Sequence, residues 1–421
     1  WGFLNRATAI GGDKVFVGDW VMEGVLDKWL DAGRKLPHQT PPYVYALDLK
    51  TGRELWKFQL DVLVKNIEYS ASRDILLVPC RHVQEWADGR WESQRKAKGK
   101  GEPGRMYALR GKTGDVIYKV TDAPYHNPHI ILDDLVIDRY GNAFNLLTGQ
   151  PATRKNPITG LDEPWGFDKG GCNHLIACEN LVTWRTAFYD LESGLGVTKL
   201  SGMDAGCSPT LIPGGGVLNI PNFGTHHKRN RMTAMALIHR PDNEHVTRYQ
   251  FTKAKGPAGD PGVVRRAGYN FGGLGDRLDD DGALWLAVTQ RSNAGLSFDP
   301  KQPQWFSAAD DHWLASGGVQ GIKEIRVPTT LNDKKGVKGQ KYDVRLYFAC
   351  PQGVRPGQHV FSVSIEDKPA LTEFDIAKET AGGSRILMKE FKDVVVDGPL
   401  NLVFEATTGE AMVSGVELIA K

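Results

Sequence analysis

The feature that most constrains the fold is a segment that recurs along the first two thirds of the chain. Tyr43-Val-Tyr-Ala-Leu-Asp-Leu-Lys-Thr-Gly-Arg-Glu-Leu-Trp56 joins an alternating strand, a Thr-Gly turn and a second strand. The pattern returns at residues 106–118, with weaker echoes at 142–149 and 186–194, and its strand alone returns at 233–239. Repetition of one supersecondary unit predicts a repeat architecture.

The spacing of the turns suggests which architecture this is. The turn glycines Gly52, Gly114, Gly149 and Gly194 are 62, 35 and 45 residues apart, and the longest step contains a polar insert around residues 95–103. A unit of about 35 to 45 residues with four strands has the length of a propeller blade. Glycine makes up 48 of the 421 residues, above the average of about 7%, because tight hairpins need positive φ. The sequence predicts an all-β fold in which about five propeller blades can be recognised, and it argues against a helical bundle.

Charge, hydropathy and cysteine content limit the kinds of partner and metal site that we expect for this chain. The chain has 52 Lys and Arg against 50 Asp and Glu, so we expect no nucleic-acid partner. No run of 18 apolar residues is present, and we expect no membrane span. Position 1 is Trp and no apolar signal segment follows, which suggests a processed or partial chain. The five cysteines form no Cys-x-x-Cys pair, and we expect no zinc, no c-type haem and no other metal-ligating set.

The repeat region resembles the pyrroloquinoline-quinone-type β-propeller repeat, most strongly at residues 43–56. Residues 170–240 are similar to a subgroup of large planctomycete-type repeat proteins, through the blocks that begin at Gly171 and Gly206. Members of that subgroup are usually longer, so the resemblance implies that further blades or another chain complete the propeller. It also implies a disulfide between Cys172 and Cys207, with two buried free thiols as the alternative.

The same resemblance raises the question of a cofactor. Quinoprotein dehydrogenases hold the quinone over a tryptophan floor, beneath a disulfide of adjacent cysteines and beside calcium. This chain has no adjacent cysteine pair and no legible tryptophan motif, so we expect no cofactor and no pyrroloquinoline quinone. Calcium is kept as a candidate ligand, although residues 276–281 fit a hairpin turn at Asp281-Gly282 better than a calcium loop.

The last hundred residues differ from the repeat. Segments at 342–348, 358–365, 393–396, 400–404 and 415–419 alternate with period two, which is typical of a β-sandwich. The motifs Asp343-Val-Arg-Leu-Tyr-Phe-Ala349, Gly357-Gln-His-Val-Phe361 and Ser414-Gly-Val-Glu-Leu-Ile419 resemble a malectin-like domain, a jelly roll of the carbohydrate-binding type. One departure is Cys350, where the family commonly has Glu. We therefore expect a β-propeller domain at 1–290, a linker at 291–304 and a malectin-like β-sandwich at 305–421.

Two sets of residues are candidates for catalysis on an acidic glycan. His226 and His227 would supply bases or ligands, and the adjacent Lys228 and Arg229 would bind a carboxylate or sulfate. The alternative is a solvated surface loop.

The second set is Tyr125, His126, His129, His174 and Arg185. These are the residue types that β-eliminating polysaccharide lyases use to remove the C5 proton, protonate the leaving oxygen and neutralise the uronate. The alternative is that each histidine has a structural role.

In the C-terminal module, Trp305, Trp313 and Tyr347 are candidates for stacking on sugar faces, with packing in the core as the alternative. The module resemblances favour a secreted or periplasmic carbohydrate-recognition protein linked to polysaccharide binding or breakdown. A lyase or hydrolase acting on acidic glycans and a quinoprotein oxidoreductase are the alternatives, so enzymatic activity is left open.

Overall fold

The computed structural model describes the greater part of the chain. The described residues are 3–19, 32–33, 42–60, 63–64, 66–81, 84–85, 91–92, 104–123, 128–170, 173–192, 194, 196–200, 210–215, 217–220, 234–236, 260–273, 275–290, 292–307, 313–314, 316–380 and 386–421. Among them the fold is all-β, with a single short helix, α2 (Ile376–Glu379). The chain divides into two compact units, 1–153 with 164–170, and 154–163 with 171–421.

The first unit consists of small antiparallel sheets. One sheet has the order β1-β2-β3-β4, with strands β1 (Phe3–Gly11), β2 (Lys14–Asp19), β3 (Tyr43–Asp48) and β4 (Glu54–Gln59). The next has the order β11-β10-β7-β5 with β6 also on β7, with strands β5 (Leu63–Val64), β6 (Glu68–Ser70), β7 (Ile75–Arg81), β10 (Gly104–Arg110) and β11 (Val116–Ala123). The smaller pairings are β8 (Gln84–Glu85) with β9 (Trp91–Glu92), and β12 (Ile130–Leu132), β13 (Leu135–Ile137) and β14 (Ala143–Asn145) as a three-stranded sheet.

The alternation of β7 explains how these sheets pack. Leu76 and Val78 belong to the core shared with the β1–β4 sheet, whereas Ile75 and Leu77 belong to the core shared with β13 and β14. Successive side chains of a strand point to opposite faces, so both faces of this sheet are buried against a neighbouring sheet. This layered packing is the kind that the repeat predicts.

The second unit begins with three further small groups of strands. They are the hairpin of β15 (Thr153–Lys155) and β16 (Asp162–Pro164), the sheet of β17 (Ile176–Ala177), β18 (Leu181–Thr183), β19 (Ala187–Asp190) and β20 (Val197–Lys199), and the sheet of β21 (Ile212–Gly214), β22 (Val217–Asn219) and β23 (Ala234–Ala236). The predicted strand–turn–strand units are thus present. Within the described residues they form separate small sheets, and no closed propeller is seen.

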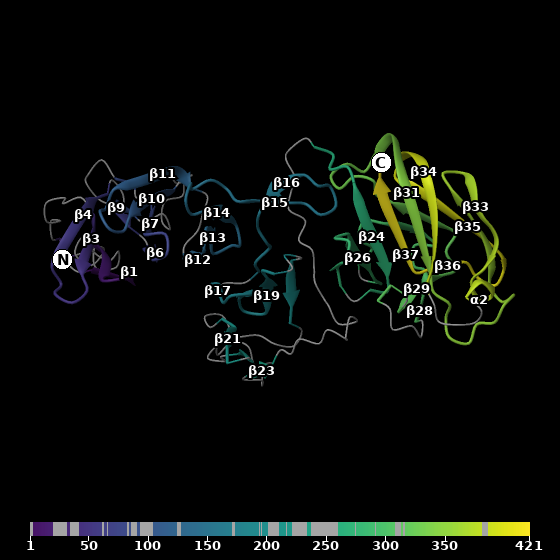
Figure 1. Cartoon of the computed structure of the whole chain (residues 1–421), viewed down its shortest axis with the longest axis horizontal. Coiled ribbons are helices and arrows are strands. Elements are labelled where there is room, and N and C mark those ends of the chain that lie inside the picture. Colours follow the sequence, from purple (N-terminus) through teal and green to yellow (C-terminus); the bar gives the residue numbers. More distant parts are fainter. Residues whose placement is uncertain are drawn as a thin grey trace. The chain divides into compact units, whose positions relative to one another are not determined.

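The rest of the second unit is a β-sandwich, whose long strands are coloured green to yellow in Figure 1. Its six-stranded sheet has the order β25-β26-β24-β37-β31-β34, with strands β24 (Arg266–Phe271), β25 (Arg277–Leu278), β26 (Leu284–Val288), β31 (Val337–Phe348), β34 (Leu387–Gly398) and β37 (Gly415–Ala420). The facing five-stranded sheet has the order β27-β30-β35-β32-β33, with strands β27 (Ser297–Asp299), β30 (Glu324–Val327), β32 (Val360–Ile365), β33 (Lys368–Asp375) and β35 (Leu400–Thr408). A three-stranded sheet joins β28 (Gln304–Ser307), β29 (Gly317–Gln320) and β36 (Met412–Val413).

The sandwich begins earlier in the chain than the expected boundary at residue 305. Strand β24 pairs antiparallel with β37 and parallel with β26, so residues 266–288 are part of the six-stranded sheet. Assigning residues 266–288 to a repeat domain ending at 290 was therefore wrong. The expected linker at 291–304 contains β27, which pairs with β30 of the facing sheet. The strand that joins residues 266–288 to the rest of the sandwich, β37, lies more than a hundred residues further along the chain, and a local alternation pattern carries no information about such a partner.

No helix among the described residues is long and apolar enough to cross a membrane.

The sandwich core yields the first prediction. Phe361 is fully buried and packs against the rings of Phe348, Phe374 and Phe404. Phe361→Ala should lower the free energy of unfolding by about 3 to 5 kcal/mol, because it removes an aromatic side chain and leaves a cavity. Val395→Ala, at an exposed position on β34, is the control. Equal urea midpoints for the two variants would contradict this packing.

Candidate functional site

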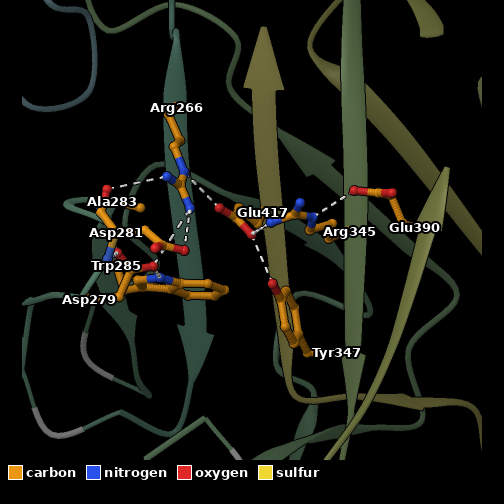
Figure 2. Close-up of polar contacts among 9 residues, drawn as sticks. All are labelled: Arg266, Asp279, Asp281, Ala283, Trp285, Arg345, Tyr347, Glu390 and Glu417. Carbon is orange, nitrogen blue, oxygen red and sulfur yellow. Dashed lines mark hydrogen bonds and ion pairs between the residues drawn. The ribbon is translucent and has the colours of Figure 1, made fainter. Parts of the chain in front are cut away.

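A row of charged side chains crosses the outer face of the six-stranded sheet. Alternation sends Val344 and Leu346 of β31 into the core, so Arg345 and Tyr347 point to the opposite face. By the same rule Glu417 of β37 and Arg266 of β24 lie on that outer face. Figure 2 shows these side chains and Glu390 of β34 pointing toward one another across four adjacent strands. We call Arg266, Glu417, Arg345 and Glu390 the polar row.

Glu417 is the centre of the polar row. Its side chain is 1% exposed and lies between two guanidinium groups. Arg266 Nε donates to Glu417 Oε1 at 2.9 Å, and Arg345 Nη1 donates to Oε2 at 3.4 Å. The hydroxyl of Tyr347 donates to the same Oε2 at 2.8 Å. Three donors therefore compensate the burial of one carboxylate, as a buried charge requires.

The outer ends of the polar row are also paired. Arg345 Nε donates to Glu390 Oε1 at 2.9 Å. On the other side, Arg266 Nη2 lies 3.8 Å from Asp279 Oδ2 and 3.9 Å from Asp281 Oδ2. Each guanidinium thus faces carboxylates on both sides, and its orientation is fixed before any ligand arrives.

These contacts shift the pKa values of Arg345, Glu390 and Tyr347. Burial disfavours the charge of Arg345, but its hydrogen bond to Glu390 and the carboxylate of Glu417 outweigh burial and raise the pKa of Arg345. The hydrogen bond from Arg345 lowers the pKa of Glu390. Burial, followed by the charge of Glu417, raises the pKa of Tyr347, which therefore stays a neutral donor.

A tryptophan lies beside the polar row on the same face. The indole of Trp285 covers Gly268 of β24, where a Cβ atom would come within 2.2 Å of Trp285 Cδ2. Glycine at this position is what lets the ring approach the backbone. Trp285 Nε1 donates to Asp279 Oδ2 at 3.0 Å, and the ring meets those of Trp313 and Tyr347 edge-on at centroid distances of 5.2 Å.

The acidic stretch around Asp279 forms a hairpin turn. Asp279 Oδ1 accepts hydrogen bonds from the backbone N–H groups of Asp281 and Ala283, and Gly282 has a φ of +77°. The expected hairpin turn at Asp281-Gly282 is confirmed, since β25 and β26 pair antiparallel around it. Among the residues that the structure describes, no group of three or more His, Cys, Asp or Glu is arranged to hold a metal ion.

Most of the predicted catalytic residues lie outside the described residues. They are Tyr125, His126, His226 and His227, together with the predicted anion-binding pair Lys228 and Arg229 and the predicted disulfide pair Cys172 and Cys207. Their roles stay predictions.

His129 lies in the first unit with a fully buried side chain. Its Nδ1 is 3.5 Å from Glu68 Oε1, its backbone N–H donates to the same oxygen, and its ring meets Phe144 edge-on. The predicted catalytic role of His129 stays a prediction.

In the second unit, the exposed His174 precedes β17, and the half-buried Arg185 lies between β18 and β19. The carbonyl of His174 accepts a hydrogen bond from Thr210 Oγ1 at 2.7 Å. The predicted catalytic roles of these two residues also stay predictions.

The three predicted stacking aromatics lie in different surroundings. Trp305 of β28 is partly buried and packs against the sandwich core. Trp313 packs on Trp285, and the guanidinium of Arg277 lies 5.0 Å from its ring centroid. Only Tyr347 contacts the polar row directly. The sequence interpretation missed Arg266, Arg345, Glu390 and Glu417, although charged residues at outward positions of apolar strands were a usable signal.

Comparison with known proteins supports the assignment of the sandwich. Residues 333–418 match the malectin domain family, which confirms the predicted malectin-like module. No family match covers the predicted quinoprotein-type repeat. No curated protein matches the chain.

Several solved structures resemble part of the chain. A Bacteroides uniformis beta-glucuronidase is 18% identical with a TM-score of 0.30, over 37% of this chain and 18% of that one. The plant receptor-like kinase FER is 21% identical with a TM-score of 0.29, over 37% and 42%. The ANX1 ectodomain from Arabidopsis thaliana is 17% identical with a TM-score of 0.30, over 37% and 41%. The chain thus spans less than half the length of each.

The central position of Glu417 yields a stability prediction. Glu417→Ala should lower the free energy of unfolding by about 3 kcal/mol, because two guanidinium groups and a phenol lose their shared acceptor. Asp281→Ala removes a carboxylate that also faces Arg266 but is 82% exposed, and it should cost less than about 0.5 kcal/mol. Urea unfolding of both variants provides the measurement. A similar loss in the two would show that Glu417 does not hold the row.

The pairing of Glu390 yields a prediction about pH. Its carboxyl should titrate below the ordinary glutamate value of 4.5, and Arg345→Met should return it to that range. A depressed pKa means that this pairing stabilises the fold above the unfolded-state pKa and is lost as pH falls through the folded-state pKa. Carbon-13 NMR of the side-chain carboxyl checks this, and an unchanged titration in the variant would contradict it.

Proposed function

We propose that this chain is an extracytoplasmic carbohydrate-binding protein, and that its malectin-like sandwich binds glycan at the polar row. The match of residues 333–418 to the malectin domain family supports the ligand class, since malectin domains bind glycans. The same match supports a location outside the cytoplasm. The position of the binding surface rests on the geometry of the sheet.

The observation that carries the proposal is a set of fixed polar groups beside an accessible apolar surface. Arg345 and Glu390 are held by each other at 2.9 Å, yet 28% and 25% of their side-chain surfaces reach solvent. Tyr347 pairs across the sheet with Met388 of β34, which is 45% exposed. Sugars present hydroxyl groups at their edges and C–H groups on their faces. A preorganised polar pair next to Tyr347 and Met388 matches both features.

The charges of this face favour an uncharged glycan over a uronate. Arg345 already faces Glu390 and Glu417, and Arg266 already faces Glu417, Asp279 and Asp281. An incoming carboxylate would find its cationic partners neutralised and would approach several carboxylates at once, which is unfavourable. Hydroxyl groups can donate to Glu390 and accept from Arg345 without this repulsion.

Two matched substitutions on one strand test the proposal. Met388→Glu places a charge on the expected sugar-facing surface and should weaken binding of a neutral glycan at least about fivefold. Val395→Glu makes the same change on β34 at a similarly exposed position, ~20 Å further along the strand, and should leave binding unchanged. A glycan array followed by calorimetry on the whole chain measures both. Equal affinities for the two variants would place the binding surface elsewhere.

A further inference from the structure

One hairpin of the repeat type is built into the sandwich. In three turns an Asp or Asn side-chain oxygen accepts hydrogen bonds from the backbone N–H groups two and three residues later, at 2.8 to 3.1 Å. In each turn a glycine four residues after the Asp or Asn has a φ between +68° and +71°. These turns are residues 48–52, 145–149 and 156–160. The third, Asn156-Pro-Ile-Thr-Gly160, is therefore another copy of the repeat turn, although its strands are short.

The three copies differ in where their middle residue lies. Lys50 in the first turn is exposed, and Leu147 in the second is 43% exposed. The equivalent Ile158 is 1% exposed and belongs to the buried core of the sandwich, in the same cluster as Val264 and Ala267. An Asx turn brings its middle residue to the tip of a hairpin. Ile158 is thus an apolar residue at the tip of a hairpin, and its side chain is buried in the core of the sandwich.

The backbone of Ile158 also pairs with the start of β24. Its carbonyl accepts hydrogen bonds from the N–H groups of Arg265 at 2.8 Å and Arg266 at 3.1 Å. The carbonyl of Arg265 accepts in turn from the N–H of Ala420, the last residue of β37. Arg266 is the residue whose guanidinium holds Glu417 Oε1. A short series of hydrogen bonds, through the backbone and then the side chain of Arg266, therefore connects Ile158 to the polar row.

The other end of this hairpin is anchored to the β17–β20 sheet. Arg154 Nε donates to the buried Glu163 at 2.8 Å, and Asn156 Nδ2 donates to the same carboxylate at 2.7 Å. Arg154 Nη1 reaches the hydroxyl of Tyr189 at 3.3 Å and the carbonyl of Gly194 at 3.4 Å. We call residues 154–163 the clasp hairpin, because they contact a sheet of the repeat type and the sandwich at once.

We infer that the clasp hairpin positions Arg266, with Ile158 as the positioning residue, and that glycan affinity at the polar row therefore depends on a segment far outside the malectin match. If Ile158 leaves its site, the N–H groups of Arg265 and Arg266 lose their acceptor, and the first residues of β24 become less firmly held. The guanidinium of Arg266 then loses its fixed relation to Glu417. The part of this inference that concerns affinity rests on the proposed function, whereas the part that concerns Arg266 does not.

Amide hydrogen exchange and glycan binding on the whole chain test the inference. Ile158→Asp should raise exchange at Arg265, Arg266 and Ala420 about tenfold or more, and exchange at Phe361 and Val363 in the facing sheet should stay slow. Glycan affinity should fall about fivefold to tenfold, because the site loses preorganisation. Leu147→Asp makes the same change in the equivalent exposed turn and should alter neither quantity. The conservative variant Ile158→Val should keep both the exchange rates and the glycan affinity close to those of the wild-type chain.

Three outcomes would overturn the inference. Unchanged exchange at Arg266 in Ile158→Asp would mean that the clasp hairpin does not position β24. A uniform rise across both sheets would mean that Ile158 is only a core residue. Local loosening with unchanged affinity for a neutral glycan that the wild-type chain binds would mean that Arg266 does not tune the site. If the wild-type chain binds no glycan, the proposed function fails, and the exchange measurement still decides whether Ile158 positions Arg266.

Discussion

The carboxylate of Glu417, buried between Arg266 and Arg345, is the interaction on which the outer face of the sandwich depends. It joins β24, β37 and β31, and Arg345 extends the connection to Glu390 on β34. A buried charge is stable only while its partners stay in place. The same residues that define the candidate binding surface therefore also hold four strands in register. This dual role explains why a row of charged side chains is present on a sheet whose other face packs against the apolar core.

The repeat region and the sandwich bury the faces of their sheets in different ways. In the repeat region a sheet such as that of β7 is buried on both faces by neighbouring sheets. In the sandwich, one face of each main sheet meets the other across a single core, which leaves the outer face available for polar groups. The second arrangement leaves a face on which charged side chains can be ordered beside exposed apolar ones such as Met388. The proposed glycan site accordingly lies there.

Much of the local structure could be predicted from alternation and turn chemistry. The strand–turn–strand unit at residues 43–56 is present as β3 and β4, and the motifs around Val344, Phe361 and Val416 are strands of the sandwich. The start of the sandwich was misplaced, because β24 and β26 look like any other short apolar strands until the pairing of β24 with β37 is known. The candidate site was missed for the same reason. Arg266 and Glu417 are 151 residues apart, and nothing local marks them as partners.

The clasp hairpin shows the division between sequence and tertiary structure most clearly. The turn follows from local chemistry alone, since Asn156, Thr159 and Gly160 supply its side-chain acceptor, its hydroxyl and its positive φ through bonds that span only a few residues. The same local chemistry forms the exposed turn that carries Leu147. The burial of Ile158 in the sandwich core does not follow from that chemistry, because burial depends on which distant surface is present to exclude water. The identity of the strands was therefore local information, whereas the candidate site and its support came from long-range pairing.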